Sequence, residues 1–277
     1  MCNFINNMKI PKKLYEKNTN GKILYVRHGI TQYNQDRKTM DKKLLRIKEK
    51  YIDCPLNENG INSAKNLQET FNKLEIEQVY VSPLYRALQT AYFIFKNHPK
   101  KNEFDIKIHP LISEKSTSVH DFCRKIKESK KDFNEKSEVS FNWKIFDNYY
   151  DNELKQNTFF MNFMDNLSEE KKIEFINKLK KDDKNYKKIE VEISKFGSDF
   201  LLESFKHLFL RNLEFKNFLK KEHEKTLNDI NKKIVVITHS AYSKLSTSLK
   251  AYNMEQINEY PDDCLKLNNC EVISMYI

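Results

Sequence analysis

The sequence predicts a three-layer α/β/α sandwich around a mostly parallel sheet, with a largely helical insertion. First, short apolar runs alternate along the chain with segments whose apolar residues recur at helical spacing, which is typical of an α/β fold. Second, residues 234–238 form a continuous β-branched run, as in a strand at the middle of a parallel sheet. Third, residues 115–197 are highly charged and nearly free of glycine, which indicates an insertion over one edge of the sheet.

The expected strands are apolar runs that end at polar residues or at a turn. Their ranges are 23–26, 79–81, 106–111, 234–238 and 271–277. Residues 35–52 are rich in lysine and arginine and are expected to form a solvated loop or helix.

The expected helices fill most of the stretches between these strands. Apolar spacing predicts one over 60–74 and another over 83–96, where a proline suits the first helical turn. A third is expected to begin at Ser240. In the later part of the chain, Ser168 and Ser198 are expected to cap helices, the second of them long.

Length and composition indicate one globular unit. With 277 residues, 39% hydrophobic and 32% charged, we expect a single domain over 21–277 behind a polar leader at 1–20. The net charge of +10 favours anionic ligands by long-range attraction. Nucleic acid is not the expected partner, because the lysines are interleaved with acids rather than gathered on one face. Nothing in the sequence indicates an oligomeric state.

Five cysteines without a Cys-x-x-Cys pair argue against a disulfide framework or a zinc site. They favour a reducing compartment, so the predicted location is the cytoplasm. The first ten residues are too polar for a signal-peptide core, and no apolar run approaches the length that crosses a bilayer. No membrane association is expected.

Residues 23–34 carry the most informative pattern of the chain. An apolar run stops at Arg27, His28 and Gly29, and Asn34 follows. We interpret this as a buried strand that delivers an imidazole beside a fixed positive charge, with a glycine that lets a ligand approach the backbone closely. This combination suits nucleophilic attack on a phosphoryl group.

Chemically capable side chains follow the ends of several predicted strands. His28 and His239 each end a strand, and the carboxyl ends of parallel strands border a common ligand crevice. Arg86 falls in a first helical turn, where its guanidinium and free backbone N–H groups can both face an anion. Glu114 lies three residues beyond the third strand. Other acids compete for its position: Glu16, Glu58, Glu103 and Asp121. The other histidines lack metal-ligand spacing and are expected to be surface or packing residues: His98, His109, His120, His207 and His223.

Five segments together resemble a known family. They are Arg27-His28-Gly29-x-Thr31-x-x-Asn34, Asp53-x-Pro55-Leu56-x-x-x-Gly60, Ser82-Pro83-Leu84-x-Arg86-Ala87-x-Gln89-Thr90-Ala91, Glu114 and Thr238-His239-Ser240. In this order they resemble the histidine phosphatase superfamily, also called the phosphoglycerate mutase-like family. The resemblance spans residues 22–277, and residues 115–197 match least.

The resemblance implies covalent catalysis. His28 would be the nucleophile and would form a phosphohistidine, while Glu114 would protonate the leaving oxygen and then deprotonate the attacking water. The neighbouring guanidiniums should depress the pKa of His28, which attacks in its neutral form.

The resemblance also implies a binding set for the phosphoryl group. Arg27, Arg86 and His239 would clamp its oxygens, and Asn34 would donate a hydrogen bond to it. Thr31 is expected to order the loop. No metal and no other cofactor are implied, because the cationic clamp opposes the charge that magnesium opposes in other phosphoryl-transfer enzymes.

Within the family we favour a phosphatase that hydrolyses a phosphomonoester. The dimeric glycolytic mutases of the family carry an Arg-Arg pair that grips the substrate carboxylate, and this chain has no such pair. A phosphoglycerate mutase and a non-catalytic scaffold of the same fold are the alternatives. The expected substrate is a small phosphorylated compound, or a phosphoprotein if the insertion leaves the pocket open.

Overall fold

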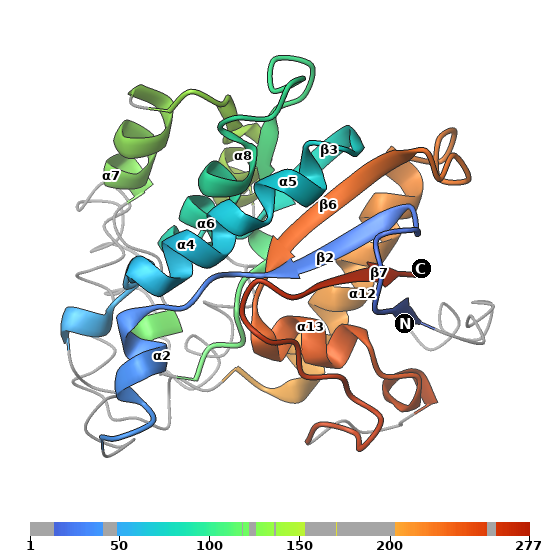
Figure 1. Cartoon of the computed structure of the whole chain (residues 1–277). Coiled ribbons are helices and arrows are strands. Elements are labelled where there is room, and N and C mark those ends of the chain that lie inside the picture. Colours follow the sequence, from blue (N-terminus) through green and yellow to red (C-terminus); the bar gives the residue numbers. More distant parts are fainter. Residues whose placement is uncertain are drawn as a thin grey trace.

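The computed structural model describes residues 14–40, 49–117, 119–121, 126–135, 137–152, 170, 203–253 and 259–277. Within this part of the chain, strands form one seven-stranded sheet in the order β1-β7-β2-β6-β3-β4-β5 (Figure 1). The strands are β1 (Tyr15–Glu16), β2 (Ile23–Arg27), β3 (Glu75–Val81), β4 (Ile106–Ile108), β5 (Phe141–Asn142), β6 (Lys232–Thr238) and β7 (Val272–Met275). The neighbouring strands β2, β6, β3, β4 and β5 pair in parallel. Strand β7 is antiparallel to both of its neighbours, β1 and β2.

Helices connect the strands and cover the sheet. The α-helices are α2 (Gln32–Asp36), α4 (Glu58–Asn66), α5 (Gln68–Phe71), α6 (Tyr85–Phe95), α7 (Ile126–Lys130), α8 (Lys144–Asn152), α12 (Phe205–Glu222) and α13 (Ser240–Ser246). Short 3₁₀ turns lie at Glu49–Tyr51, Pro110–Ile112, Val119–Asp121 and Lys250–Asn253, and Lys131–Glu135 forms a π-helical turn. No helix among these residues is both long and apolar enough to cross a membrane.

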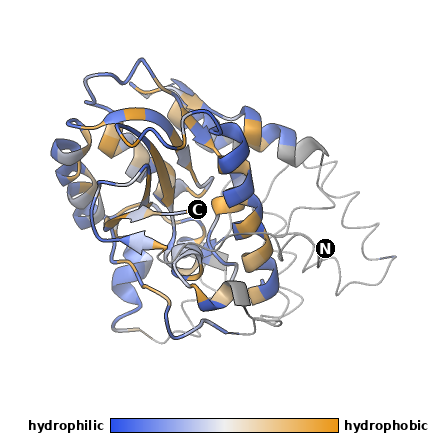
Figure 2. Ribbon diagram, turned by 90° about the vertical axis from the view of Figure 1, so that its right-hand side faces the viewer, coloured by the Kyte–Doolittle hydropathy of each residue, from blue (hydrophilic) through white to orange (hydrophobic). Residues whose placement is uncertain are grey.

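Two apolar clusters, one on each face of the sheet, join the sheet to a layer of helices on either side. Leu24 and Val26 of β2 pack with α4, α5 and α6 on one face of the sheet. The alternate residues Ile23 and Tyr25 pack with α12 and α13 on the other face. Figure 2 shows the hydrophobic residues concentrated on the central strands and on the helix faces toward them. The predicted fold class is therefore confirmed: a three-layer α/β/α sandwich around a mostly parallel sheet.

The register of the parallel strands brings the predicted motifs together. Arg27 of β2 is paired with Thr238 of β6, so the residues that follow them leave the sheet at the same level. The His28 N–H donates to the carbonyl oxygen of Thr238 at 2.9 Å. Val81 of β3 pairs with Ile237 in the same way.

Two strands lie where the sequence predicts none. Tyr15–Glu16, inside the predicted polar leader, pairs with β7 as the outermost strand. Phe141–Asn142, inside the predicted insertion, pairs in parallel with β4 and ends the sheet on the other side. The insertion therefore supplies part of the sheet as well as helices. Both strands are two residues long, so no periodic pattern could reveal them.

Two predicted helices differ from those observed. The helix expected over 60–74 is α4 followed by α5, because Leu67 donates its N–H to Ala64, three residues back, which tightens that turn. The long helix expected to begin at Ser198 instead begins after Ser204, whose Oγ accepts the N–H of His207 at 3.2 Å. The helix predicted after Ser168 lies outside the described residues except for Glu170, which is helical.

Candidate active site

The predicted functional residues gather at the carboxyl ends of the parallel strands. A cavity of about 780 Å³ opens there, and five of the six predicted side chains line it: Arg27, His28, Asn34, Arg86 and Glu114. The sixth, His239, is fully buried, and its ring centroid lies 5.0 Å from that of His28. Figure 1 shows β2 and β6 ending side by side, with α2 and α13 beyond that edge.

His28 is held as a neutral imidazole. Its Nδ1 lies 2.7 Å from the carbonyl oxygen of Gly29, which only accepts, so Nδ1 carries the proton and Nε2 keeps its lone pair. Burial lowers the pKa of His28 well below its usual 6.5, and the positive charges of Arg86 and Arg27 lower it further. At neutral pH the ring is therefore uncharged and Nε2 is nucleophilic.

His239 precedes α13 and has an unsatisfied nitrogen. Its Nε2 lies 2.7 Å from Ser82 Oγ, which also accepts the N–H of Leu84 at 3.3 Å. Nε2 is the one acceptor that the described residues offer to the serine proton, so the geometry favours donation from Ser82 to Nε2, which leaves the ring proton on Nδ1. Nδ1 is buried without a partner among the described residues. Burial, and then the charge of Arg86, lowers the pKa of His239 well below 6.5.

The two predicted arginines are fixed by backbone carbonyls. Arg27, the last residue of β2, donates from Nη1 to the carbonyl oxygen of Leu267 at 2.6 Å. Its Nε is buried without an acceptor in the described part of the chain. Arg86 lies in the first turn of α6 and donates from Nη1 to the carbonyl oxygen of His120 at 2.8 Å. Its Nη2 lies 3.3 Å from Asp121 Oδ1.

Glu114 is a partly buried carboxyl, and the described residues engage only one of its oxygens. Its Oε1 accepts N–H groups from Lys115 at 2.9 Å, Ala241 at 3.0 Å and Tyr242 at 3.3 Å. For Oε2 the described residues provide no hydrogen bond. Burial raises the pKa of Glu114 above its usual 4.5, and the negative charge of Asp121 raises it further. This shift favours the protonated form that a general acid needs.

Asn34 and Thr31 form a reciprocal cap at the start of α2. The N–H of Asn34 donates to Thr31 Oγ1, and the N–H of Thr31 donates to Asn34 Oδ1, both at 3.2 Å. The expectation that Thr31 orders this loop is confirmed. Because the side-chain oxygen of Asn34 is engaged, its amino group is the part that can bind a ligand in the cavity.

The expectation for Gly29 is wrong. A methyl group there would lie 2.7 Å from the carbonyl oxygen of Gly60, and one on Gly60 would collide with the backbone of Ile30. The missing side chains therefore allow two backbone segments to pack against each other. They do not make room for a ligand, because the space beside Gly29 is filled by the start of α4.

The first turn of α6 also differs from expectation. The N–H of Tyr85 donates to Asp53 Oδ1 at 2.7 Å, so this amide is not free to bind an anion. Asp53 adopts a positive φ of 42°, which turns the chain so that its carboxylate meets the helix. This contact gives the Asp53 segment a structural role.

Four residues of the insertion line the cavity, namely Lys115, Thr117, His120 and Asp121, and of these the sequence indicates only Asp121 as a candidate, in competition with Glu114. The ring of His120 stacks on that of Tyr33, with centroids 3.7 Å apart. Asp121, the only one of the competing acids that lines the cavity, pairs with Arg86 and accepts the N–H of Thr117 at 3.0 Å. Glu114 therefore keeps its predicted position, and Asp121 supplies a second carboxylate.

Arg211 of α12 braces the segment that carries Glu114. It is 3% exposed, and each of its N–H groups has an acceptor. Nη1 donates to the carbonyl oxygens of Leu111 at 2.7 Å and Ser113 at 2.8 Å. Nη2 donates to the carbonyl oxygen of Glu114 at 3.1 Å and, like Nε, to the carboxylate of Glu203. No local sequence signal indicates this contact.

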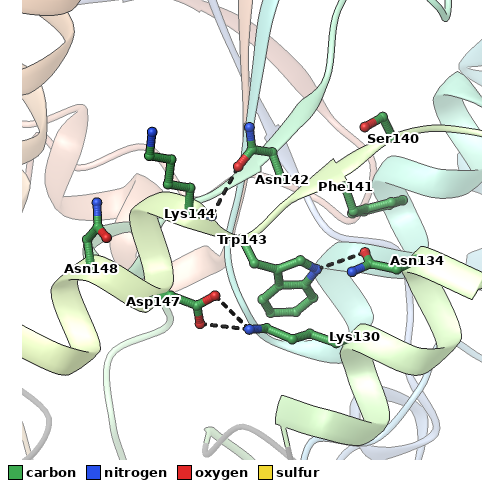
Figure 3. Close-up of a pocket in the computed structure, with 9 residues that line it drawn as sticks. All are labelled: Lys130, Asn134, Ser140, Phe141, Asn142, Trp143, Lys144, Asp147 and Asn148. Atoms are coloured by element: carbon green, nitrogen blue, oxygen red, sulfur yellow. Dashed lines mark hydrogen bonds and ion pairs between the residues drawn. The ribbon is translucent and has the colours of Figure 1, made fainter.

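A second hollow, of about 500 Å³, lies within the insertion (Figure 3). Lys130 Nζ pairs with the two carboxylate oxygens of Asp147 at 2.6 and 2.8 Å. Trp143 Nε1 donates to Asn134 Oδ1 at 3.2 Å. Because these groups satisfy one another and include no nucleophile beside a base, the larger cavity is the candidate active site.

Part of the chain matches a known protein family. Residues 23–153 match the model of the histidine phosphatase superfamily (branch 1). The fructose-2,6-bisphosphatase TIGAR B of Danio rerio is 36% identical over 97 residues, which cover 35% of this chain and 35% of that protein. The 2,3-bisphosphoglycerate-dependent phosphoglycerate mutase of Chlamydia muridarum is 32% identical over 79 residues, 28% of this chain and 31% of that protein. The matches thus span about a third of the length of these curated relatives.

Among solved structures, a phosphoserine phosphatase of Entamoeba histolytica in complex with 3-phosphoglyceric acid is similar at 17% identity and a TM-score of 0.40. The similarity covers 90% of this chain and 87% of that one. The family match is thus limited to residues 23–153, just under half of the chain, and this segment is similar to the histidine phosphatase superfamily.

Proposed function

We propose that the protein is a phosphatase that hydrolyses phosphomonoesters through a phosphohistidine on His28. The observation that carries this proposal is a pair of buried donors, Arg27 Nε and His239 Nδ1, that lack acceptors among the described residues. A buried donor without a partner costs roughly 1–3 kcal/mol. A phosphoryl group beside His28 supplies the missing acceptor oxygens.

In the first step, Nε2 of His28 attacks the phosphorus of the bound ester. The phosphorus–oxygen bond to the alcohol breaks, and protonated Glu114 gives its proton to the leaving oxygen. Arg27 and Arg86 oppose the charge on the phosphoryl oxygens, while His239 and Asn34 donate hydrogen bonds to them. The lowered pKa of His28 and the raised pKa of Glu114 favour the protonation states with which this step begins.

In the second step, water attacks the phosphohistidine. The carboxylate of Glu114 takes a proton from the water, the nitrogen–phosphorus bond breaks, and phosphate leaves. His28 returns to the neutral form with its lone pair on Nε2, and Glu114 is again protonated. The fixed guanidiniums supply the positive charge throughout, so we expect the reaction to proceed without a metal. Full activity in excess chelator is the result expected, and restoration of lost activity by magnesium would contradict it.

The substrate and compartment are proposed more broadly. A small phosphorylated compound is favoured, because the cavity of about 780 Å³ falls within the size range of small-molecule sites. Hydrolysis of phosphoproteins stays a prediction. The cytoplasm is proposed from the cysteine pattern, and Cys54, Cys264 and Cys270 are free thiols.

A phosphoglycerate mutase is the second candidate, favoured by the match to the mutase of Chlamydia muridarum. The two activities separate in one assay with 3-phosphoglycerate and catalytic 2,3-bisphosphoglycerate. Release of inorganic phosphate without isomerisation supports the phosphatase. Isomerisation faster than phosphate release supports the mutase.

Trapping the intermediate tests the proposal directly. We expect the wild type to form an acid-labile phosphoenzyme when it is quenched during turnover of a radiolabelled substrate, and His28→Ala to form none. His207→Ala, on α12 and outside the cavity lining, is the matched control and should keep the label. Label that persists in folded His28→Ala would show that another residue is the nucleophile. A wild type that neither hydrolyses nor labels would favour the non-catalytic scaffold.

A further inference from the structure

The residue after the proposed nucleophile is a glycine, and its carbonyl group orients the ring of that nucleophile. His28 Nδ1 donates to the carbonyl oxygen of Gly29 at 2.7 Å, and this contact leaves the lone pair on Nε2. Glycine has more backbone freedom than any other residue, and no larger residue fits at this position beside Gly60. Other groups are therefore needed to fix the peptide bond between His28 and Gly29.

Both polar atoms of this peptide bond have side-chain partners. Its carbonyl oxygen, on His28, accepts an N–H of Asn269 Nδ2 at 2.9 Å. Its N–H, on Gly29, donates to Thr90 Oγ1 at 3.0 Å, and that hydroxyl donates to the carbonyl oxygen of Arg86 at 2.7 Å. Asn269 and Thr90, which belong to remote segments of the chain, thus hold a single peptide group from its two polar atoms.

Asn269 lies in a turn whose backbone is anchored without its side chain. Strand β7 runs antiparallel beside β2, so the turn before β7 borders the end of β2 (Figure 1). The N–H of Cys270 donates to the carbonyl oxygen of Arg27 at 2.9 Å, and the N–H of Arg27 donates to that of Glu271 at 3.3 Å. The N–H of Glu271 donates to the carbonyl oxygen of Asn268 at 3.1 Å, which closes the turn. Because these contacts use backbone atoms, a change of the Asn269 side chain should leave the turn in place.

We propose that Asn269 is a positioning residue for the nucleophile. It fixes the peptide bond after His28 and, through the carbonyl group of Gly29, the direction of the His28 ring. Asn269 also lines the cavity, but its amino group donates to the backbone, so its role is orientation rather than ligand binding. Without this contact the Gly29 carbonyl would turn away from Nδ1, and Nε2 would face the phosphorus for only part of the time. The effect on rate rests on the proposed phosphatase function, whereas the effect on the ring does not.

The kinetic test replaces Asn269 with leucine, which has a similar size and no donor. In Asn269→Leu, kcat should fall by about tenfold or more while KM stays within about twofold, because a misplaced nucleophile slows the chemical step and leaves the phosphate-binding groups in place. Asn97→Leu, at an exposed position just after α6, is the matched control and should keep both wild-type values.

A double variant tests whether Asn269 and Thr90 act on the same peptide group. Thr90→Val removes the hydroxyl that accepts the N–H of Gly29 and should lower kcat as well. Asn269→Leu/Thr90→Val should lose little more than the more affected single variant, because the effects of residues that share a partner do not add. Losses that multiply in the double variant would overturn the joint hold on this peptide.

Nitrogen NMR of histidine-labelled protein reports the state of the ring without turnover. In the ligand-free wild type at neutral pH, His28 should carry its proton on Nδ1 alone, and His28→Gln identifies these resonances by their absence. In Asn269→Leu we expect a second tautomer with the proton on Nε2, because the Gly29 carbonyl no longer stays at Nδ1. Asn269→Ala only shortens the side chain and should give the same result, which guards against a disturbance caused by leucine.

The outcomes separate this inference from the proposed function. Wild-type kcat and a single tautomer in the folded leucine and alanine variants would overturn it. A raised KM with unchanged kcat would also overturn it, because Asn269 would then bind the ligand. A lower kcat with unchanged ring resonances would assign Asn269 a structural role alone and contradict the proposal. If the wild type hydrolyses no phosphoester and forms no phosphoenzyme, the proposed function fails, and the ring resonances still decide the role of Asn269.

Discussion

Asp121 pairs with Arg86, which is proposed to bind the phosphoryl group, and its charge also acts on Glu114, the proposed acid. Its Oδ1 lies 3.3 Å from Arg86 Nη2 and 3.0 Å from His120 Nε2, and its Oδ2 accepts the hydroxyl of Thr117 at 2.8 Å. Its negative charge adds to the effect of burial in raising the pKa of Glu114. Asp121 thus holds the guanidinium of Arg86 and also favours the protonated form of Glu114.

The substitution Asp121→Asn tests this role through the pH profile. It keeps an oxygen for Arg86 but removes the charge that raises the pKa of Glu114, so the alkaline limb of kcat/KM should move to lower pH. The acid limb, which follows protonation of His28, should move less. Profiles are measured between about pH 4 and 9, a range that includes the ordinary pKa values of both types of side chain.

Asp147→Asn, in the insertion but outside the cavity lining, is the matched control and should leave both limbs in place. An alkaline limb that stays in place in Asp121→Asn would show that this carboxylate does not act on the acid. Lower activity with an unchanged profile would assign it a structural role alone.

At the scale of elements, α12 positions the acid although it contributes no side chain to the cavity. Its Arg211 binds the carbonyl oxygens of Leu111, Ser113 and Glu114, and its charge is balanced by Glu203. The helix therefore holds the segment after β4 at a fixed distance from α13, whose N–H groups bind the Glu114 carboxylate.

The substitution Arg211→Lys removes most of this brace, because an ammonium cannot reproduce the forked contacts of a guanidinium. We expect kcat to fall by about 10- to 100-fold, since a small misplacement of a reacting group has effects of this size. KM should change little, because Arg27 and Arg86, which are proposed to bind the phosphoryl group, are held by other carbonyls. Steady-state kinetics on one substrate gives both values.

Lys206→Met, an exposed charge change on the same helix, is the control for that experiment. Arg211→Met should be more severe than Arg211→Lys, because it leaves Glu203 buried without a cation. A wild-type kcat in either folded variant would show that the position of Glu114 does not depend on Arg211 of α12.

At the scale of the whole molecule, buried neutral histidines couple stability to pH. Burial lowers the pKa values of His28, His98 and His239 below 6.5, and it lowers that of His109 to about 3. Below about pH 6.5 the unfolded chain binds protons that the native state does not bind. The free energy of unfolding should therefore fall as the pH drops from 6.5 toward the lowered pKa values.

His109 offers a test of this coupling outside the active site. Its Nδ1 accepts the N–H of Leu111 at 3.3 Å, a contact that the side-chain oxygen of asparagine can also make. Between about pH 7.5 and 5, His109→Asn should lose about 2 kcal/mol less unfolding free energy than the wild type, from about 1.4 kcal/mol per pH unit. Urea unfolding measures both values. His207→Asn serves as the control, and an equal loss in His109→Asn and the wild type would contradict this origin.

The layered fold and the positions of the predicted site residues could be inferred from local patterns. Strand-forming runs that stop at a histidine predict imidazoles at one edge of a parallel sheet, and His28 and His239 lie there. The roles proposed for these residues stay predictions until kinetics tests them. Helix limits were predicted less accurately, since the long helix expected to begin at Ser198 begins after Ser204, and a serine can cap a helix at either position.

The contacts that complete the site could not be inferred in the same way. Gly29 packs on Gly60, Asp121 pairs with Arg86, and β5 extends the sheet beside β4. Each of these contacts joins segments that are separated along the chain. The local sequence around one partner does not indicate which distant residue it contacts.

The sequence by itself determined the alternation of strands and helices, the family motifs and the histidines at the strand ends. These features depend on neighbouring residues, because hydrophobic periodicity and capping act over a few positions. Tertiary structure decided which groups surround Glu114 and which residues line the cavity. Burial and distance set pKa values and ion pairs, and both arise only when remote segments of the chain pack together.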